Sequence, residues 1–164
     1  MKLEQVCSIT SSKRVFADEY TDSGVPFYRG LEITQKSLGN NINNCLYISN
    51  NKFNYIKKKY GVPSKYDLFI TAVGTIGSIY QAKGEDFYFK DGNIIWLKNF
   101  NKSVICSSFL KYYLQSEYVK KQINNKLIGA VQKALTIDTL SDINIQVPGI
   151  NTQLRITNIV RNCI

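Results

Sequence analysis

The stretch "DLFITAVGTIGSIYQA" (residues 67–82) contains two apolar, β-prone runs separated by Gly74 and Gly77. Short apolar runs bounded by glycine predict two strands joined by a turn, because glycine adopts the positive φ angles that tight turns need. A phosphate-binding P-loop instead needs Lys and Ser or Thr directly after its last glycine. Here Gly77 is followed by Ser78 and Ile79, and a Rossmann fingerprint would need a third glycine and a helix. The sequence therefore favours a turn between two strands.

Strand patterns continue on both sides of this stretch. Runs rich in aromatic and β-branched residues predict further strands within 25–33, 45–49, 87–90 and 93–98. Asp91-Gly92 is a strong signal for a two-residue hairpin between the last two runs. Residues 67–98 are therefore expected to form an antiparallel meander of about four strands.

Helices are expected around these strands. Residues 2–9 predict a short entry segment, and residues 50–60 predict a helix that stops before Gly61. Ser107 or Ser108 can cap a helix that continues through the lysines up to Lys126.

The end of the chain predicts a last strand and a last helix. The strand covers 143–148, and the helix starts near Asn151 and runs to the C-terminus. The fold class that follows is α/β in the α+β sense. We expect a mixed, mostly antiparallel curved sheet with flanking short helices and a C-terminal helix that would start a spacer coiled coil.

Length and composition indicate one globular domain. The chain has 164 residues, of which 44% are hydrophobic, and no apolar run approaches the roughly 20 residues of a membrane span. The N-terminal sequence "MKLEQVCSIT" lacks the apolar core of a signal peptide, so we expect a cytoplasmic protein without a membrane partner. The four cysteines lie far apart in sequence and are expected to be reduced, mostly buried thiols: Cys7, Cys45, Cys106 and Cys163.

The charge balance indicates an anionic partner. The formal net charge is +9, which favours nucleic acid or another anionic surface, although the many Lys, Asn and Ile residues also fit AT-rich coding. The chain contains no histidine, which excludes Ser-His and Cys-His catalytic pairs and His-based metal sites within it. Asp18-Glu19 and Glu85-Asp86 lie in turn-like contexts and are interpreted as solvated pairs. We expect no cofactor, no metal and no catalytic residues.

An ordered set of motifs resembles one known family. The motifs are "VPFYRGLEI" (25–33), "GVPSKYDLFITAVGTIGSIY" (61–80), "FYFKDGNIIWL" (87–97), "SSFLKYYLQS" (107–116) and "IGAVQKALTIDTLSDINIQVPGINTQLRI" (128–156). In order and spacing they resemble the target-recognition domain of type I restriction-modification specificity subunits. Any one of them alone is a weak signal, whereas five in order are specific.

The resemblance implies a non-catalytic, sequence-specific DNA-binding subunit. Such subunits carry two recognition domains, each of which reads one half of a split double-stranded DNA target. The helix after each domain pairs into an antiparallel spacer. Modification (methyltransferase) subunits that use S-adenosylmethionine, and the restriction subunit joined through them, supply the chemistry. On this basis residues 1–150 would be the recognition domain and 151–164 the start of the spacer helix.

The chain departs from the family in length, because it holds one recognition domain. From Asn151 the last helix has 14 residues, about 21 Å at the usual helical rise, whereas the family's spacer helix is longer. A natural half-subunit, a truncated or split product and an excised domain all remain open. Three residues spaced like a coiled-coil seam are the candidate subunit interface, either against the domain or in a two-fold homodimer: Ile156, Val160 and Cys163.

The candidate DNA contacts are basic and polar residues in predicted loops and turns. Arg can read a guanine edge with two hydrogen bonds, Gln can pair with an adenine edge, and Lys contacts phosphate. For Arg29 a structural ion pair is the alternative, and for the 129–133 loop a turn satisfied internally. The candidates are Lys13, Arg14, Tyr28, Arg29, Lys36, Thr75, Gln132 and Lys133.

Two other classes of function stay open at this point. The first is a small DNA-acting enzyme with a carboxylate site assembled from distant residues. The second is an interaction module that binds methyltransferase subunits as a decoy and does not bind DNA. The basic balance and the loop arginines favour DNA binding over the second.

Overall fold

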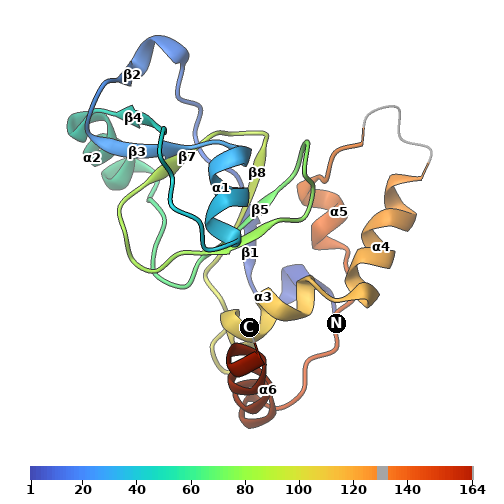
Figure 1. Ribbon diagram of the computed structural model, residues 1–164. Helices are drawn as coiled ribbons and strands as arrows, with labels where there is room; N and C mark the ends of the chain where they lie inside the picture. Colours follow the sequence, from blue (N-terminus) through green and yellow to red (C-terminus); the bar gives the residue numbers. More distant parts are fainter. Residues whose placement is uncertain (129–132, 164) are drawn as a thin grey trace.

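The computed structural model describes residues 1–128 and 133–163, which form two four-stranded sheets with helices on their outer sides (Figure 1). The first sheet is antiparallel, in the order β1 (Ser8–Thr10), β8 (Ile94–Lys98), β5 (Leu68–Thr71), β6 (Ile79–Gln81). The second has the order β2 (Tyr20–Thr21), β4 (Leu46–Ile48), β3 (Val25–Tyr28), β7 (Tyr88–Phe89), with β3 and β7 parallel. The predicted mixed α/β fold class is confirmed.

The first sheet is the central layer, because both of its faces are buried. Leu68 and Ile70 of β5 belong to one apolar cluster, whereas Phe69 between them belongs to the other. The same alternation holds in β8, where Leu97 and Trp96 lie in different clusters. Successive side chains of a strand point to opposite faces, so one sheet supports two cores.

Helices cover the outer sides of this layer. α1 (Gly30–Ser37) contacts β5 and β6, and α2 (Asn50–Lys59) buries Phe53 and Ile56 in the second cluster. α3 (Ser107–Leu114), α4 (Glu117–Leu127) and α5 (Ile137–Ser141) belong to the other side, and α6 (Ile150–Cys163) packs against α3. Two 3₁₀ turns, η1 (Leu3–Gln5) and η2 (Ala17–Glu19), complete the described elements. In Figure 1, α6 lies at the bottom and the arm formed by α4 and α5 lies at the right.

The predicted turn at 74–77 is confirmed. β5 and β6 pair antiparallel on either side of it, and Gly74 and Gly77 have φ angles of 72° and 88°. A Cβ atom at either glycine would meet nothing within 4 Å. The positive φ angles, and not close packing, therefore explain why both residues are glycine.

The predicted meander is wrong at its third strand. β7 does not pair with β8 but joins the second sheet parallel to β3, so Asp91-Gly92 connects strands of different sheets. The aromatic side chains around β7 explain this placement, because Phe87 and Phe89 are fully buried against Phe69 in the second cluster. The predicted strand at 25–33 ends at Tyr28, and α1 begins at Gly30.

Three predictions in the C-terminal half are corrected. Neither Ser107 nor Ser108 caps α3, because the residue before the helix is Cys106 and both serine hydroxyls bond to Gln81. The helix does not continue to Lys126: α3 ends at Leu114, and Ser116 caps a separate α4. Residues 143–148 form only an isolated bridge, Asn144 to Lys2, in place of a strand.

All four cysteines are free thiols, and burial raises the pKa of the Cys7 thiol to about 12. Only Cys7 is fully buried, and Cys163 is exposed. Among the helices of the described residues, none combines the length and apolar character needed to cross a membrane.

Candidate nucleic-acid interface

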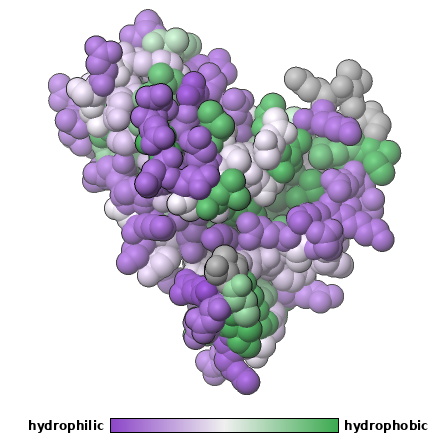
Figure 2. Space-filling model, in the orientation of Figure 1, coloured by the Kyte–Doolittle hydropathy of each residue, from purple (hydrophilic) through white to green (hydrophobic). Residues whose placement is uncertain are grey.

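A cavity of about 450 Å³ lies at the N-terminal end of α1. Its wall comes from the residues after β3 and after β5 and from Asn93 just before β8. It brings together two predicted site residues that are far apart in sequence, Arg29 and Thr75. Figure 2 shows that the molecule is notched between the lobe that holds the second sheet and the arm of α4 and α5. Residues next to the ends of β3, β5 and β8 therefore line one cavity.

Arg29 is held in a fixed position by Glu32. Its Nε and Nη2 atoms donate to the two carboxylate oxygens of Glu32 at 3.2 and 2.6 Å, and its backbone N–H donates to the same carboxylate at 2.7 Å. The Glu32 side chain is only 1% exposed, whereas that of Arg29 is 43% exposed. The structural ion pair left open by the sequence is therefore present.

The ion pair does not use all the donors of Arg29. A guanidinium carries five N–H groups, and Glu32 engages two of them. Burial alone would raise the pKa of Glu32, but the hydrogen bonds from Arg29 lower the pKa below its usual value. Glu32 therefore stays ionised at neutral pH and keeps the remaining guanidinium donors of Arg29 in one orientation beside the cavity.

The turn that carries Thr75 is fixed from inside. The Thr71 hydroxyl accepts from the Ser78 backbone N–H at 3.0 Å and donates to the Thr75 carbonyl. The Ser78 hydroxyl in turn accepts from Thr34 on α1 at 3.3 Å. The turn and the middle of α1 are thus linked, and the Thr75 side chain lines the cavity without having to hold the turn together.

Arg14 and Lys13 project from the loop after β1. The Arg14 Nε atom donates to Asp91 at 2.9 Å, and its side chain is 67% exposed, so most of its donors face solvent. Asp91 lies two residues before Asn93, which lines the cavity. Lys13 points elsewhere, with its ammonium 5.1 Å from the centre of the Tyr60 ring. Arg14 is thus connected to the cavity wall through Asp91 and the neighbouring Asn93. Lys13 lies at the end of α2, over the Tyr60 ring.

Lys133 is exposed beside the end of β5. The Leu135 backbone N–H donates to the Ala72 carbonyl at 2.8 Å, which brings the segment after residue 132 next to the strand that leads into the turn. Lys133 is two residues from this contact. Gln132, also a predicted DNA contact, lies outside the described residues.

Tyr28 and Lys36 do not line this cavity. Tyr28 is 5% exposed and stacks on Phe87, and burial together with the nearby Glu85 charge raises the pKa of its hydroxyl to about 12. Because so little of it reaches the surface, we assign Tyr28 to the core and remove it from the proposed contacts. Lys36 lies at the other end of α1, where its ammonium is 3.2 Å from Glu85 and sits over the Tyr28 and Tyr80 rings.

The candidate interface residues lie on α6, which docks on the domain through polar side chains. Gln153 and Thr157 are its buried residues. Ile156 and Val160 line an apolar groove of about 620 Å³ together with residues of α3 and Pro148, and Cys163 is exposed. Ile159 is not among the predicted interface residues, yet it is 63% exposed and lies between Ile156 and Cys163 at helical spacings of three and four.

The sequence also missed Asn93 and Glu32. Both are predicted only as strand residues, Asn93 within 93–98 and Glu32 within 25–33. The signal for Glu32 was its position three residues after Arg29 at a helix start, the spacing of a capping box. Within 1–128 and 133–163, no group of three or more acidic or cysteine side chains is arranged to hold a metal ion.

Comparison with known proteins identifies the family. The family described as "Type I restriction modification DNA specificity domain" matches residues 1–164. The chain belongs to this family. It is 31% identical over 161 residues to S.HindORF215P of Haemophilus influenzae, a protein provisionally described as a type I restriction enzyme specificity subunit. That match covers 98% of this chain but 38% of the relative, so the chain spans little more than a third of the relative's length.

Solved structures of the family share the fold. A chain from a study of assembly and conformational transition of the type I restriction-modification system superposes with a TM-score of 0.73 at 18% identity, over 99% of this chain and 37% of that one. The HsdS subunit from Thermoanaerobacter tengcongensis gives 0.67 at 19% identity, over 99% and 36%. The S subunit of a type I system from M. genitalium gives 0.64 at 19%, over 98% and 37%.

Proposed function

We propose that this specificity domain recognises a short sequence in double-stranded DNA as a recognition domain of a type I restriction-modification specificity subunit. The observation that supports this most directly is that Arg29 and Thr75 line the same cavity. The Arg29 guanidinium is held in place by Glu32 and still has free N–H donors. A fixed fork of N–H donors suits the guanine edge in the major groove.

The contacts divide into base-reading and phosphate-binding residues. Arg29 is the proposed base reader, with Thr75 beside it. Arg14 and Lys133, which are exposed around the same end of the sheets, are proposed phosphate contacts, and Lys13 extends them toward α2. Phosphate contacts set affinity and orientation, whereas base contacts set the sequence preference.

The domain is proposed to have no catalytic role of its own. Family membership supports modification subunits as partners and, through them, a restriction subunit. In this proposal residues 1–150 recognise DNA, and residues 151–164 begin a helix that packs on another helix through Ile156, Ile159 and Cys163. Val160 contributes to the adjoining groove.

Selection of bound duplexes from a random pool, followed by affinity measurements on the selected sequence, tests the proposal. The comparison variant is Arg29→Lys, which keeps a positive charge beside Glu32 but loses the planar fork. We expect about 1–3 kcal/mol less discrimination at one position of the site, with non-specific binding unchanged. Lys58→Ala on α2 is the control and should leave the selected sequence unaltered.

Two results would contradict the proposal. If the wild-type chain enriches no sequence and binds no duplex, the domain does not read DNA, and a decoy for modification subunits becomes the better explanation. If the chain consumes S-adenosylmethionine or cuts DNA in the presence of magnesium, the non-catalytic assignment is wrong.

A further inference from the structure

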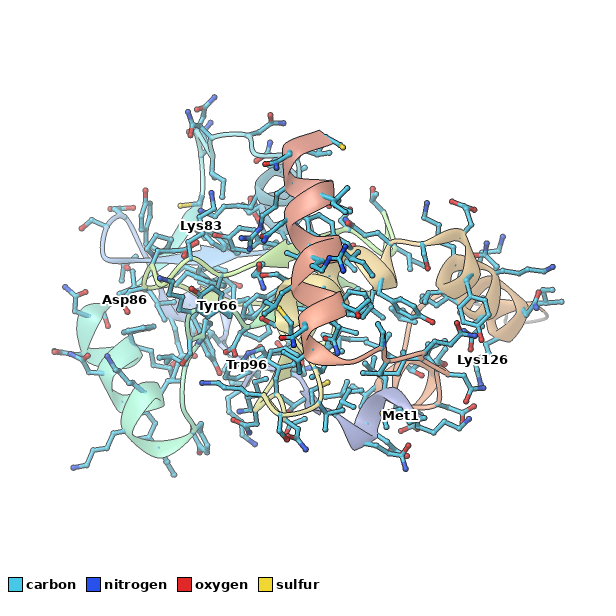
Figure 3. The ribbon with its side chains drawn as sticks, turned by 90° about the horizontal axis from the view of Figure 1, so that it is seen from below. Met1, Tyr66, Lys83, Asp86, Trp96 and Lys126 are labelled. Atoms are coloured by element: carbon cyan, nitrogen blue, oxygen red, sulfur yellow. The ribbon has the colours of Figure 1, made fainter. Side chains whose placement is uncertain are left out.

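A second cavity, of about 480 Å³, lies at the C-terminal end of α1 and is rich in cationic residues. Its wall contains Lys36, Lys65, Lys83, Lys111 and Arg161, together with Tyr66. In Figure 3, Tyr66 and Lys83 lie on one side of α6, with Lys126 on the other. We call this cavity the basic groove.

The fold brings these cations together from five parts of the chain, the first of which is α1 with Lys36. Lys65 precedes β5 and Lys83 follows β6, and the two ends meet because the Tyr66 N–H donates to the Ala82 carbonyl at 2.9 Å. Lys111 comes from α3, and Arg161 comes from α6. The Arg161 guanidinium donates to Ser108 at 3.0 Å, and Ser108 donates to Gln81 at 3.0 Å, so the groove is built on a hydrogen-bonded floor.

Most of this positive charge has no carboxylate opposite it. Lys36 is the exception, since it pairs with Glu85 at 3.2 Å. Burial alone would raise the pKa of Glu85, but hydrogen bonds, first that from Tyr80, lower it, so the carboxylate is ionised and already engaged. Among the described residues, the other four cations of the groove form no ion pair.

The unbalanced positive charge affects the pKa of Lys111. Burial lowers the pKa of its ammonium, and the positive charges of Arg161 and Lys83 lower it further. Cations that repel one another inside a partly closed groove are stabilised by an anion that touches several of them at once.

We propose that the basic groove binds the phosphodiester backbone of DNA next to the bases read around Arg29. This inference rests on the proposed function. The two cavities lie at opposite ends of α1, whose eight residues span about 12 Å at the usual rise. Successive phosphates of one duplex lie within that distance, so one DNA molecule can reach both. Figure 2 shows a band of hydrophilic residues across the same face, above α6.

The position of Arg161 gives the groove a second role in this proposal. Arg161 belongs to α6, whereas Lys65 and Lys83 belong to the sheet loops. A phosphate held between them contacts both the recognition domain and the helix that leaves it. DNA binding at the groove would thus add a contact between the last turns of α6 and the domain, beyond the hydrogen bond from Arg161 to Ser108.

The test compares two charge-matched double variants. Lys65→Gln with Lys83→Gln removes two cations from the groove, and Lys57→Gln with Lys58→Gln removes two exposed cations from α2. Duplex affinity is measured across a series of salt concentrations, on the selected sequence and on a random duplex. The groove variant should weaken both duplexes by the same factor and reduce the slope of log K against log salt by about 1.8, for two lost phosphate contacts. The α2 variant should keep the wild-type slope.

Lysine methylation with and without duplex provides an independent readout. Lys83 should be protected by DNA in the wild-type chain, and Lys57 should not.

If the groove and α2 variants change affinity and slope equally while the wild type still selects a sequence, the groove inference is wrong and the proposed function stands. If poly-glutamate binding depends on Lys65 and Lys83 but DNA binding does not, the groove serves an acidic protein segment, and the inference is overturned. A wild-type chain that binds no duplex removes the proposed function and the groove inference together.

Discussion

The Oε1 atom of Gln153 accepts a hydrogen bond of 2.8 Å from the backbone N–H of Cys106. The Nε2 group of the same side chain donates to the carbonyls of Val104 and Pro148 at 2.8 and 2.7 Å. Gln153 is fully buried, in the first turn of α6. One amide therefore joins α6 to the loop before α3 and to the segment that precedes α6, and it sets the rotation of α6 on the domain.

Replacing Gln153 by leucine tests this clamp. Gln153→Leu keeps a similar volume but leaves one backbone N–H and two carbonyls without their partner, so we expect a loss of about 2–4 kcal/mol in the free energy of unfolding. Urea denaturation measures it. The matched control is Gln146→Leu, because Gln146 is exposed and its side chain makes no hydrogen bond within the described residues. Equal stabilities for the two variants would show that the clamp contributes nothing.

The pair of Arg29 and Glu32 predicts a pH-dependent contribution to stability. The pKa of Glu32 is lowered in the folded chain, so its contribution is present above the unfolded pKa of about 4.3 and is lost as the pH falls through the folded value. We expect Glu32→Gln to cost about 1–2 kcal/mol at pH 7, with the difference from wild type shrinking below pH 4. Unfolding measured from pH 7 to pH 3 gives this difference. A gap that stays constant over the whole range would contradict the assignment.

An alanine substitution is expected to have opposite effects at Gly77, in the turn between β5 and β6, and at Gly30, at the start of α1. Gly77→Ala forces a Cβ into a backbone with φ of 88°, and we expect a loss of about 1–2 kcal/mol. Gly30→Ala, at the start of α1, meets no atom within 4 Å and needs no positive φ, so it should be neutral or stabilising by up to about 1 kcal/mol. Thermal unfolding of both variants measures the two changes in stability. A stabilising Gly77→Ala would be incompatible with the observed turn.

The exposed apolar residues of α6 predict weak self-association. Ile156 and Ile159 offer a short stripe, which is little surface for a stable dimer of 14-residue helices. We expect the chain to sediment as a monomer over a range of concentrations and Ile159→Asp to sediment identically. A concentration-dependent dimer that Ile159→Asp abolishes, and that Asn158→Asp leaves intact, would instead identify the stripe as a homodimer seam.

Local signals in the sequence were sufficient for the elements that begin and end with a distinct residue. The glycines at 74 and 77 mark the turn, and Gly61, with a φ of 81°, marks the end of α2. The last helix starts at Ile150, one residue from its predicted start. At the three glycines, a positive φ angle of one residue decides the boundary.

Pairing between distant segments could not be predicted in this way. The alternation of Ile143 and Ile145 is real, since both are buried, but their neighbours at Met1 and Leu3 supply too few hydrogen bonds for a strand. β7 belongs to the second sheet, where it pairs with β3, and its Phe89 ring packs on Phe69 of β5. These partners are distant in sequence. For the site, Arg29 and Thr75 were predicted as separate candidates, and only the fold brings them to one cavity.

The two-sided central sheet has a consequence for synthesis on the ribosome. The cluster on one face of this sheet draws its buried residues from Val15 to Trp96, whereas the cluster on the other face extends from Leu3 to Ile145. About fifty residues must therefore still be translated after the first set is complete, which takes roughly 3–10 s at ordinary elongation rates. During that interval α3, α4 and α5 are still being added, so Leu68, Ile70 and Leu97 are only partly covered and the nascent chain is most exposed to aggregation before these helices have packed.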